Sequence, residues 1–263
     1  MLIDVHGHIG FHTPHAVPPA RLATYAGVCG LDWVLVSNRD AACEPAGAPN
    51  LSELDANTAC LEACRKHAHL IPLYWVRVGQ PDSLVQAVAG ALQIEPFVGA
   101  VFSPAETGLT ANDARIEPYL AVLAEGGYPA IFCITDDPRT DATALYNQIR
   151  PLVTPPVVFC PAGASAPQRS AALEAARRAL QNQDVDLYLA TGHASAQEIR
   201  TAVHMLGPER VLFGTNAIAY GDSHVPRHIS ILDELRRTLA PDEFDRVTSE
   251  NARQLFRLEP PAA

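Results

Sequence analysis

Short apolar segments alternate with helical patterns along the whole of this 263-residue chain, and that alternation restricts the fold more than any other feature. Most of the segments are continuous apolar runs, as strands buried on both faces should be. The expected strands are residues 2–6, 33–37, 71–76, 98–103, 130–134, 157–160, 186–190 and 210–214. The pattern predicts an α/β fold in which crossover helices join parallel strands.

Two of the helical patterns carry clear start signals. Asn50 stands three residues before Glu53, and Leu51, Leu54, Thr58 and Leu61 then recur at helical spacing, which predicts a helix with these side chains on its buried face. Ser195 and Glu198 form a capping box before a second amphipathic run, which Gly207 ends. Eight such units in about 250 residues fit one closed TIM-type barrel. We expect a single domain over residues 1–258 and a frayed tail over 259–263.

The chain has 19 basic and 29 acidic side chains, so its formal net charge at pH 7 is −10. This balance argues against nucleic-acid binding or an anionic membrane surface, and it favours a small-molecule substrate. A hydrophobic share of 48% is typical of a globular chain with a large core. Met1 leads directly into the first strand without a signal-peptide pattern, so we expect a cytoplasmic protein with reduced cysteines. A homo-oligomer is compatible with the sequence.

Two histidines stand at the end of the first expected strand. His6 and His8 are two residues apart, so both imidazoles point to the same side of the strand end. Neutral imidazole is the commonest protein ligand for zinc and similar metals. Because the active site of such a barrel lies at the carboxyl ends of its strands, we expect both side chains to project into the mouth.

Four stretches carry a family resemblance that covers nearly the whole chain. They are residues 3–8, 70–77, 209–215 and 249–256. They resemble the amidohydrolase superfamily, in particular the barrel hydrolases and decarboxylases related to aminocarboxymuconate-semialdehyde decarboxylase. The resemblance implies one divalent metal at the mouth, with zinc the first candidate. It also implies hydrolysis of C–O or C–N bonds, or decarboxylation, and a terminal helix over 249–256 that closes the barrel.

The resemblance also implies metal ligands that this chain lacks. Members of the group carry histidines at the ends of the fifth and sixth strands, and the matching residues here are Cys133 and Pro161. Proline has no ligand atom in its side chain. A cysteine thiolate binds zinc, although a buried cysteine is more often an inert apolar residue, so both interpretations of Cys133 stay open. We therefore expect a metal site of His6, His8 and Cys133 to be partly occupied or empty.

Asn216 stands where relatives carry the aspartate that binds metal and takes a proton from water. A carboxamide donates and accepts hydrogen bonds but has no comparable basicity at neutral pH. We expect Asn216 to act through hydrogen bonds. A histidine, with His6, His8 and His193 as candidates, would have to serve as the base in any activity.

Further polar residues follow the expected strands and are candidates for the rim of the site. Arg39 follows the second strand, where a guanidinium can clamp a substrate carboxylate. The other candidates are Asp40, Glu106, Thr135, Asp136, Asp137, His193, and His224 in the loop after the eighth strand. His12 and His15 lie in the first loop, whose prolines (Pro14, Pro18 and Pro19) predict an ordered lid or rim and not a helix.

Three functions remain open at this point. The first is a hydrolase or lyase with a reduced single-metal site, made by His6, His8 and either Cys133 or His193, that acts on a small carboxylated or cyclic substrate. The second is a metal-independent hydrolase, resembling lactonases of the same group, in which histidines and Arg39 polarise the substrate. The third is a non-catalytic relative that binds a ligand. We favour hydrolase activity, because a chain without a site has no evident need for His6, His8 and a polar rim.

Overall fold

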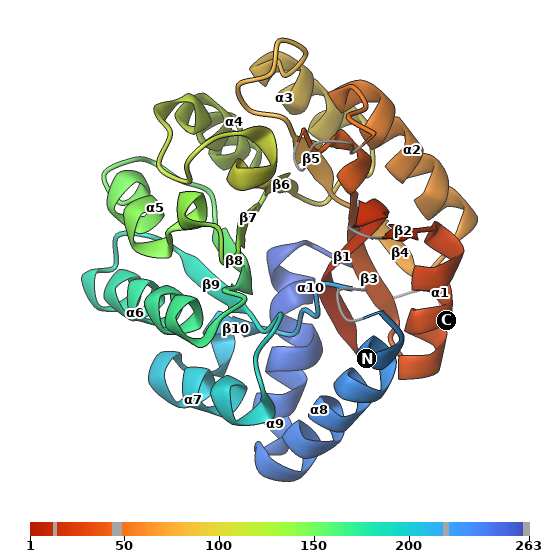
Figure 1. Ribbon diagram of the computed structural model, residues 1–263. Helices are drawn as coiled ribbons and strands as arrows, with labels where there is room; N and C mark the ends of the chain where they lie inside the picture. The colour runs from red at the N-terminus through yellow and green to blue at the C-terminus, as the bar shows by residue number, and fades with distance from the viewer. Residues whose placement is uncertain (13–14, 44–48, 218–220, 260–263) are drawn as a thin grey trace.

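The computed structural model describes residues 1–12, 15–43, 49–217 and 221–259, and within them parallel strands form a barrel inside a ring of helices (Figure 1). The barrel strands are β1 (Ile3–His12), β3 (Trp33–Asn38), β4 (Leu70–Pro72), β5 (Tyr74–Val76), β6 (Ala100–Phe102), β7 (Ala130–Ile134), β8 (Val157–Ala162), β9 (Leu187–Ala190) and β10 (Val211–Leu212). Because β4 and β5 follow each other along one line, these segments confirm all eight expected strands.

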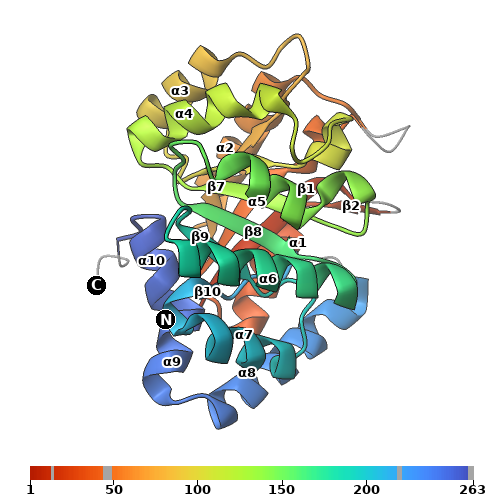
Figure 2. The same ribbon diagram turned by 90° about the vertical axis from the view of Figure 1, so that its left-hand side faces the viewer.

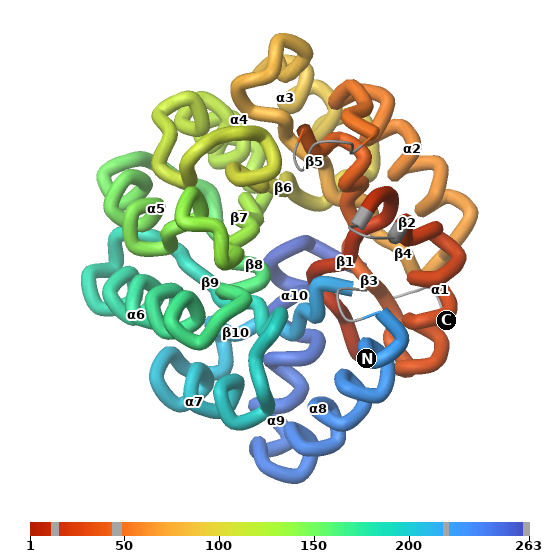
Figure 3. The backbone as a smooth tube through the Cα atoms, in the orientation of Figure 1, coloured from red at the N-terminus to blue at the C-terminus, as the bar shows by residue number. Residues whose placement is uncertain are grey.

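Hydrogen bonds connect the strands into a closed circuit. One sheet has the order β2-β1-β3-β4 and the other β10-β9-β8-β7-β6-β5. They join at Leu73, whose N–H donates to Val36, while the next N–H, of Tyr74, donates to Gly99 on the other side. The second junction is between β1 and the segment after β10, where His8 N–H donates to Ala217 O at 2.9 Å. Figure 3 shows the chain running once around the barrel, which brings the segment after β10 beside β1.

Helices cover the outside of the barrel, and Figure 2 shows them flanking the strands. They are α1 (Pro19–Cys29), α2 (Glu53–Lys66), α3 (Val85–Ile94), α4 (Glu117–Gly126), α5 (Ala142–Ile149), α6 (Ala166–Asn182), α7 (Ala196–Leu206), α8 (His224–Thr238), α9 (Pro241–Asp245) and α10 (Asn251–Leu255). Short 3₁₀ turns follow β3 and β6 as η1 (Arg39–Ala41) and η2 (Pro104–Thr107). Ala252 and Phe256 pack with the barrel-interior side chains, so the C-terminal helix closes the barrel floor as expected.

The mouth lies at the opposite end from α10 (Figure 2). There β1 continues to His12 and pairs with β2 (His15–Val17) in antiparallel register. The expected lid loop is therefore a hairpin, and the loop interpretation of His12 and His15 was wrong, because backbone pairing extends the first strand beyond its apolar run. Pro14 lies outside the described residues.

Helix α2 begins two residues later than the capping pattern predicted. Ser52 is its N-cap and accepts from Asp55 N–H, whereas Asn50 contacts Arg77. The predicted buried face was wrong at Leu54, which is 74% exposed, whereas Leu61 is buried as predicted and Glu53 is buried as well. The capping box of Ser195 and Glu198 at the start of α7 is confirmed.

None of the helices in the described part of the chain combines the length and apolar character that a membrane span requires. The expected tail over 259–263 falls largely outside the described residues, which end at 259.

Candidate functional site

A β-bulge in β1 turns the histidine motif towards the barrel interior. Ile3 and Val5 pack inside the barrel, so strict alternation would send His6 outwards with Asp4. The register between β1 and β3 shifts between Asp4 and Gly7, which resets the phase so that His6 and His8 both face inwards. On the outer side of Gly7 an added Cβ would lie 3.0 Å from Val34 Cγ1, so this position has room for little more than a hydrogen.

Asp4 supports the bulge from the outer side of the barrel wall. Its Oδ1 accepts hydrogen bonds from the N–H groups of His6 (3.0 Å) and Thr215 (2.9 Å), and its Oδ2 accepts from the hydroxyl of Tyr25 (2.9 Å). These bonds tie the end of β1 to the segment after β10. Burial raises the pKa of Asp4 to about 6, although the hydrogen bonds oppose that rise.

The inward histidines meet a cysteine from β7. His6 Nε2 lies 3.8 Å from Cys133 Sγ, and ligand atoms of His6, His8 and Cys133 all lie within 4.8 Å of one another. The side chains are buried, and the imidazole rings of His6 and His8 are 4.4 Å apart between centroids. The structure thus brings together the three residues that the sequence suggested as metal ligands.

The donor set fits a divalent metal such as zinc, which accepts imidazole nitrogen and thiolate sulfur. Ser37, at the end of β3, places its hydroxyl 2.9 Å from His8 Nδ1. When the Nδ1 proton is donated to that hydroxyl, the lone pair of His8 stays on Nε2, which is how outer residues usually orient a histidine ligand. Burial raises the pKa of the Cys133 thiol to about 11, so metal binding would have to displace a proton from it.

Arg39 lies beside this cluster and is paired with Glu106. Its positive charge partly offsets the rise in the pKa of Cys133, which places the guanidinium near the thiol. Arg39 Nη2 donates to Glu106 Oε1, and both side chains are mostly buried. Arg39 Nε has no hydrogen-bond partner among the residues that the structure describes. Burial also lowers the pKa of Arg39.

His193 and Asn216 form a second pair at the mouth, after β9 and β10. Asn216 Nδ2 lies 3.2 Å from His193 Nε2, and an amide nitrogen only donates, so the imidazole accepts at that atom. Asn216 has a φ of 56°, a left-handed conformation that asparagine tolerates better than most residues. Burial lowers the pKa of His193, which favours its neutral form.

His224 occupies a different environment from the one expected. It is the first residue of α8, not part of a loop, and it is fully buried. Its Nε2 lies 3.0 Å from Thr215 Oγ1, and its ring is 4.1 Å from that of His228. It therefore packs behind the segment that follows β10 and carries Thr215, and substrate contact, its predicted role, would require this packing to open.

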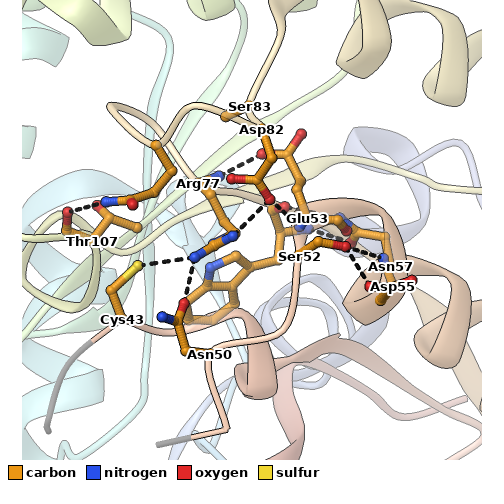
Figure 4. A network of polar contacts seen from close by, with 12 residues as sticks. Cys43, Asn50, Ser52, Glu53, Asp55, Asn57, Arg77, Asp82, Ser83 and Thr107 are labelled. Carbon is orange, nitrogen blue, oxygen red and sulfur yellow. Dashed lines mark hydrogen bonds and ion pairs between the residues drawn. The ribbon is translucent and has the colours of Figure 1, made fainter.

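Arg77 directly follows β5 and is the centre of a network that the sequence analysis did not assign (Figure 4). It donates to Asp82 at 2.6 Å, to Cys43 Sγ at 3.3 Å and to Asn50. Beneath it, Glu53 accepts from the Tyr74 hydroxyl at 2.8 Å and from Arg77 N–H at 2.7 Å. These bonds connect the loops after β3 and β5 on one side of the mouth.

Some of these contributors left a signal in the sequence. Arg77 is a charged residue immediately after an apolar strand, and Ser37 ends another, so both could have been found by position. Trp75, whose ring lies 5.8 Å from that of His8, gave no such signal, because it reads as one more apolar strand residue.

The remaining rim candidates make local contacts. Asp40 accepts from Phe11 N–H at 2.8 Å, Asp136 accepts from Ser165 N–H at 2.7 Å, and Asp137 pairs with Arg139 at 2.7 Å. Thr135 N–H donates to Thr140 Oγ1 at 2.9 Å. These side chains shape the loops around the mouth.

The fold and the mouth define the chain as a (β/α)8-barrel protein with a candidate metal centre at the carboxyl ends of its strands. The amidohydrolase family model matches residues 3–258, so the chain belongs to that family. No curated protein matches the chain.

Solved structures with the same fold are similar over nearly the whole chain but are distant in sequence. A probable 2-pyrone-4,6-dicarboxylic acid hydrolase from Acinetobacter baumannii, with citric acid bound, matches at 12% identity and a TM-score of 0.64, covering 98% of this chain and 99% of its own. A 2,6-dihydroxybenzoate decarboxylase complexed with 2,6-dihydroxybenzoate matches at 13% identity and a TM-score of 0.68, and the match covers 97% of this chain and 98% of that one. A 5-carboxyvanillate decarboxylase from Novosphingobium aromaticivorans, complexed with manganese and a nitrobenzoic acid, matches at 13% identity and a TM-score of 0.66. The match covers 90% of this chain and 80% of that one.

Proposed function

We propose that this protein is a metal-assisted hydrolase that cleaves a C–O or C–N bond in a small carboxylated or cyclic substrate, including a lactone. The observation that carries the proposal is the convergence of His6, His8 and Cys133, with ligand atoms within 4.8 Å. These residues would hold one divalent ion, for which zinc is the best match to two imidazoles and a thiolate. Three ligands and a thiol of raised pKa make incomplete occupancy the expected state at neutral pH.

A divalent ion at this place would polarise the substrate carbonyl towards attack by water. The protein side chains would supply the rest of the chemistry. Arg39 would hold a substrate carboxylate, because a guanidinium offers two parallel donors to two carboxylate oxygens. His193 would take a proton at Nε2, the atom at which it now accepts a hydrogen bond from Asn216, once that amide turns away.

Asn216 favours a decarboxylase as a second candidate. Hydrolysis needs a base that takes a proton from water, and the amide of Asn216 cannot do so. Decarboxylation breaks the bond between a carbon atom and the carboxylate, releases CO₂ and transfers a proton to that carbon. It needs a proton donor, a role that His193 can fill without a carboxylate at position 216 when the pH is low enough to protonate it, and its lowered pKa moves that pH below 6.5.

A panel of lactones, esters and hydroxybenzoates, tested with zinc, manganese and chelator, separates these functions. Hydrolysis is expected to incorporate ¹⁸O from labelled water into the product, whereas decarboxylation releases CO₂ and incorporates deuterium from D₂O. Turnover that survives complete removal of metal would replace this proposal with the metal-independent hydrolase. Binding of panel compounds without conversion under any metal condition would identify a non-catalytic relative.

A further inference from the structure

Glu106 contacts Arg39 as a bound carboxylate would. Arg39 begins η1 after β3, and Glu106 lies in η2 after β6, so the pair crosses the strand formed by β4 and β5. The exposed fractions of the two side chains are only 15% and 20%. A backbone bond of 2.8 Å from Cys43 N–H to Glu106 O holds the two loops together at the same place.

The pair leaves part of the guanidinium unused. The contact runs from Nη2 to Oε1, while Arg39 Nε is buried and has no partner within the described ranges. A buried donor without an acceptor is costly. A carboxylate that approached along the Nε and Nη2 edge would satisfy both donors at once, in the bidentate geometry that arginine favours.

The candidate metal ligands are buried in the structure in which this pair is formed. His6, His8 and Cys133 are 0%, 3% and 4% exposed, so a substrate can reach them only after a change at the mouth. Arg39 therefore interacts with a carboxylate on one loop, and its charge also acts on Cys133 in the buried cluster. Separating two buried charges without replacing either contact is unfavourable.

We infer that Glu106 is an internal competitor for the anion site of Arg39, and that the mouth opens to a ligand whose own carboxylate displaces it. This inference rests on the proposed function for the location of the substrate. It narrows the substrate class to carboxylates, because a neutral compound offers Arg39 no replacement for the charge of Glu106. Glu106 therefore determines specificity without contacting the reacting atoms.

Equilibrium binding to the metal-free full chain tests this inference. The two probes are 2,6-dihydroxybenzoate and 2,6-dihydroxybenzamide, which match in shape and differ in charge, and calorimetry gives their Kd values. We expect Glu106→Gln and Glu106→Ala to bind the acid about tenfold more tightly than wild type. Binding of the amide should change less than about twofold.

Asp82→Asn is the matched control, since Asp82 pairs with the buried Arg77 in another ion pair at the same mouth. It should leave the Kd of the acid unchanged, and melting curves establish that every variant is folded. An equal gain for acid and amide would indicate steric opening and overturn the inference, as would an acid that binds no variant more tightly than wild type. Tighter acid binding, together with no hydrolysis of the lactones and esters of the panel under any metal condition, would leave this inference standing and contradict the proposed hydrolysis alone.

Discussion

Asn216 has a left-handed backbone conformation, and its side chain can form hydrogen bonds but cannot act as a base. Its amide donates to His193 Nε2 and so stabilises the neutral imidazole, in the same direction as burial, which lowers the pKa of His193. A lowered pKa means that His193 stays neutral to a pH below its usual 6.5. Any rate that depends on His193 as a base should therefore rise with pH below 6.5 and be level above it.

Asn216→Asp should raise the pKa of His193, because an adjacent carboxylate favours the imidazolium. The titration of the His193 ring protons by NMR measures this directly and does not depend on turnover. Asn216→Ala is the control without charge, and it adds about 1 kcal/mol of backbone strain at a positive φ. A pKa that stays the same in Asn216→Asp would show that the two side chains do not interact in solution.

Helix α2 places a carboxylate where an apolar side chain was expected. Glu53 accepts hydrogen bonds from the Tyr74 hydroxyl and from Arg77 N–H, and burial raises its pKa. Its neighbour Leu54 points to solvent with 74% of its surface exposed. Glu53 therefore contributes more to stability than Leu54 does, although hydrophobicity alone would suggest the opposite.

We expect Glu53→Ala to lower the free energy of unfolding by about 3 kcal/mol, because two buried donors lose their acceptor. Leu54→Ala should change it by less than about 0.5 kcal/mol. Urea unfolding of both variants measures these two free energies. A larger loss for Leu54→Ala than for Glu53→Ala would mean that α2 is rotated relative to this structure.

How far the sequence predicts each element depends on where its determining contacts lie. Residues 130–134 were predicted to the residue, because an apolar run that follows Pro129 and ends before Thr135 and Asp136 is a local signal. The face of α2 was missed, because the partners of Glu53 come from β5 and its end, more than twenty residues away. The metal-ligand spacing of His6 and His8 was readable, whereas the bulge that turns them inwards depends on pairing with β3.

At the scale of the whole molecule, buried titratable groups make stability depend on pH. Burial lowers the pKa of His224 to about 2 and of His228 to about 4, against 6.5 in an unfolded chain. Between pH 6 and pH 4 the unfolded chain therefore holds about two protons on these residues that the folded chain does not. Asp4, with a pKa raised from 3.8 to about 6, holds one proton in the folded state only and opposes them.

These three groups together leave a net difference of about one proton, and that difference alone lowers the free energy of unfolding by about 1.4 kcal/mol for each pH unit of acidification across this window. His228→Gln removes one of the two histidine protons, so its slope should be smaller than that of wild type by about 1.4 kcal/mol per pH unit. Urea unfolding at several pH values between 4 and 7 gives both slopes. If wild type and His228→Gln have the same slope, His228 is not held neutral in the folded protein.

The central claim is that His6, His8 and Cys133 bind one divalent ion, and titration of the metal-free protein with Co²⁺ tests it most directly. A thiolate ligand produces a near-ultraviolet sulfur-to-cobalt charge-transfer band. The account predicts this band in wild type, with an affinity that rises about tenfold per pH unit because the Cys133 thiol, of pKa about 11, must release its proton. Cys160→Ser, which alters another buried cysteine of the barrel interior, should keep the band, and Cys133→Ser should lose it. A band that persists in Cys133→Ser, or a wild-type protein that binds no Co²⁺, would contradict the account.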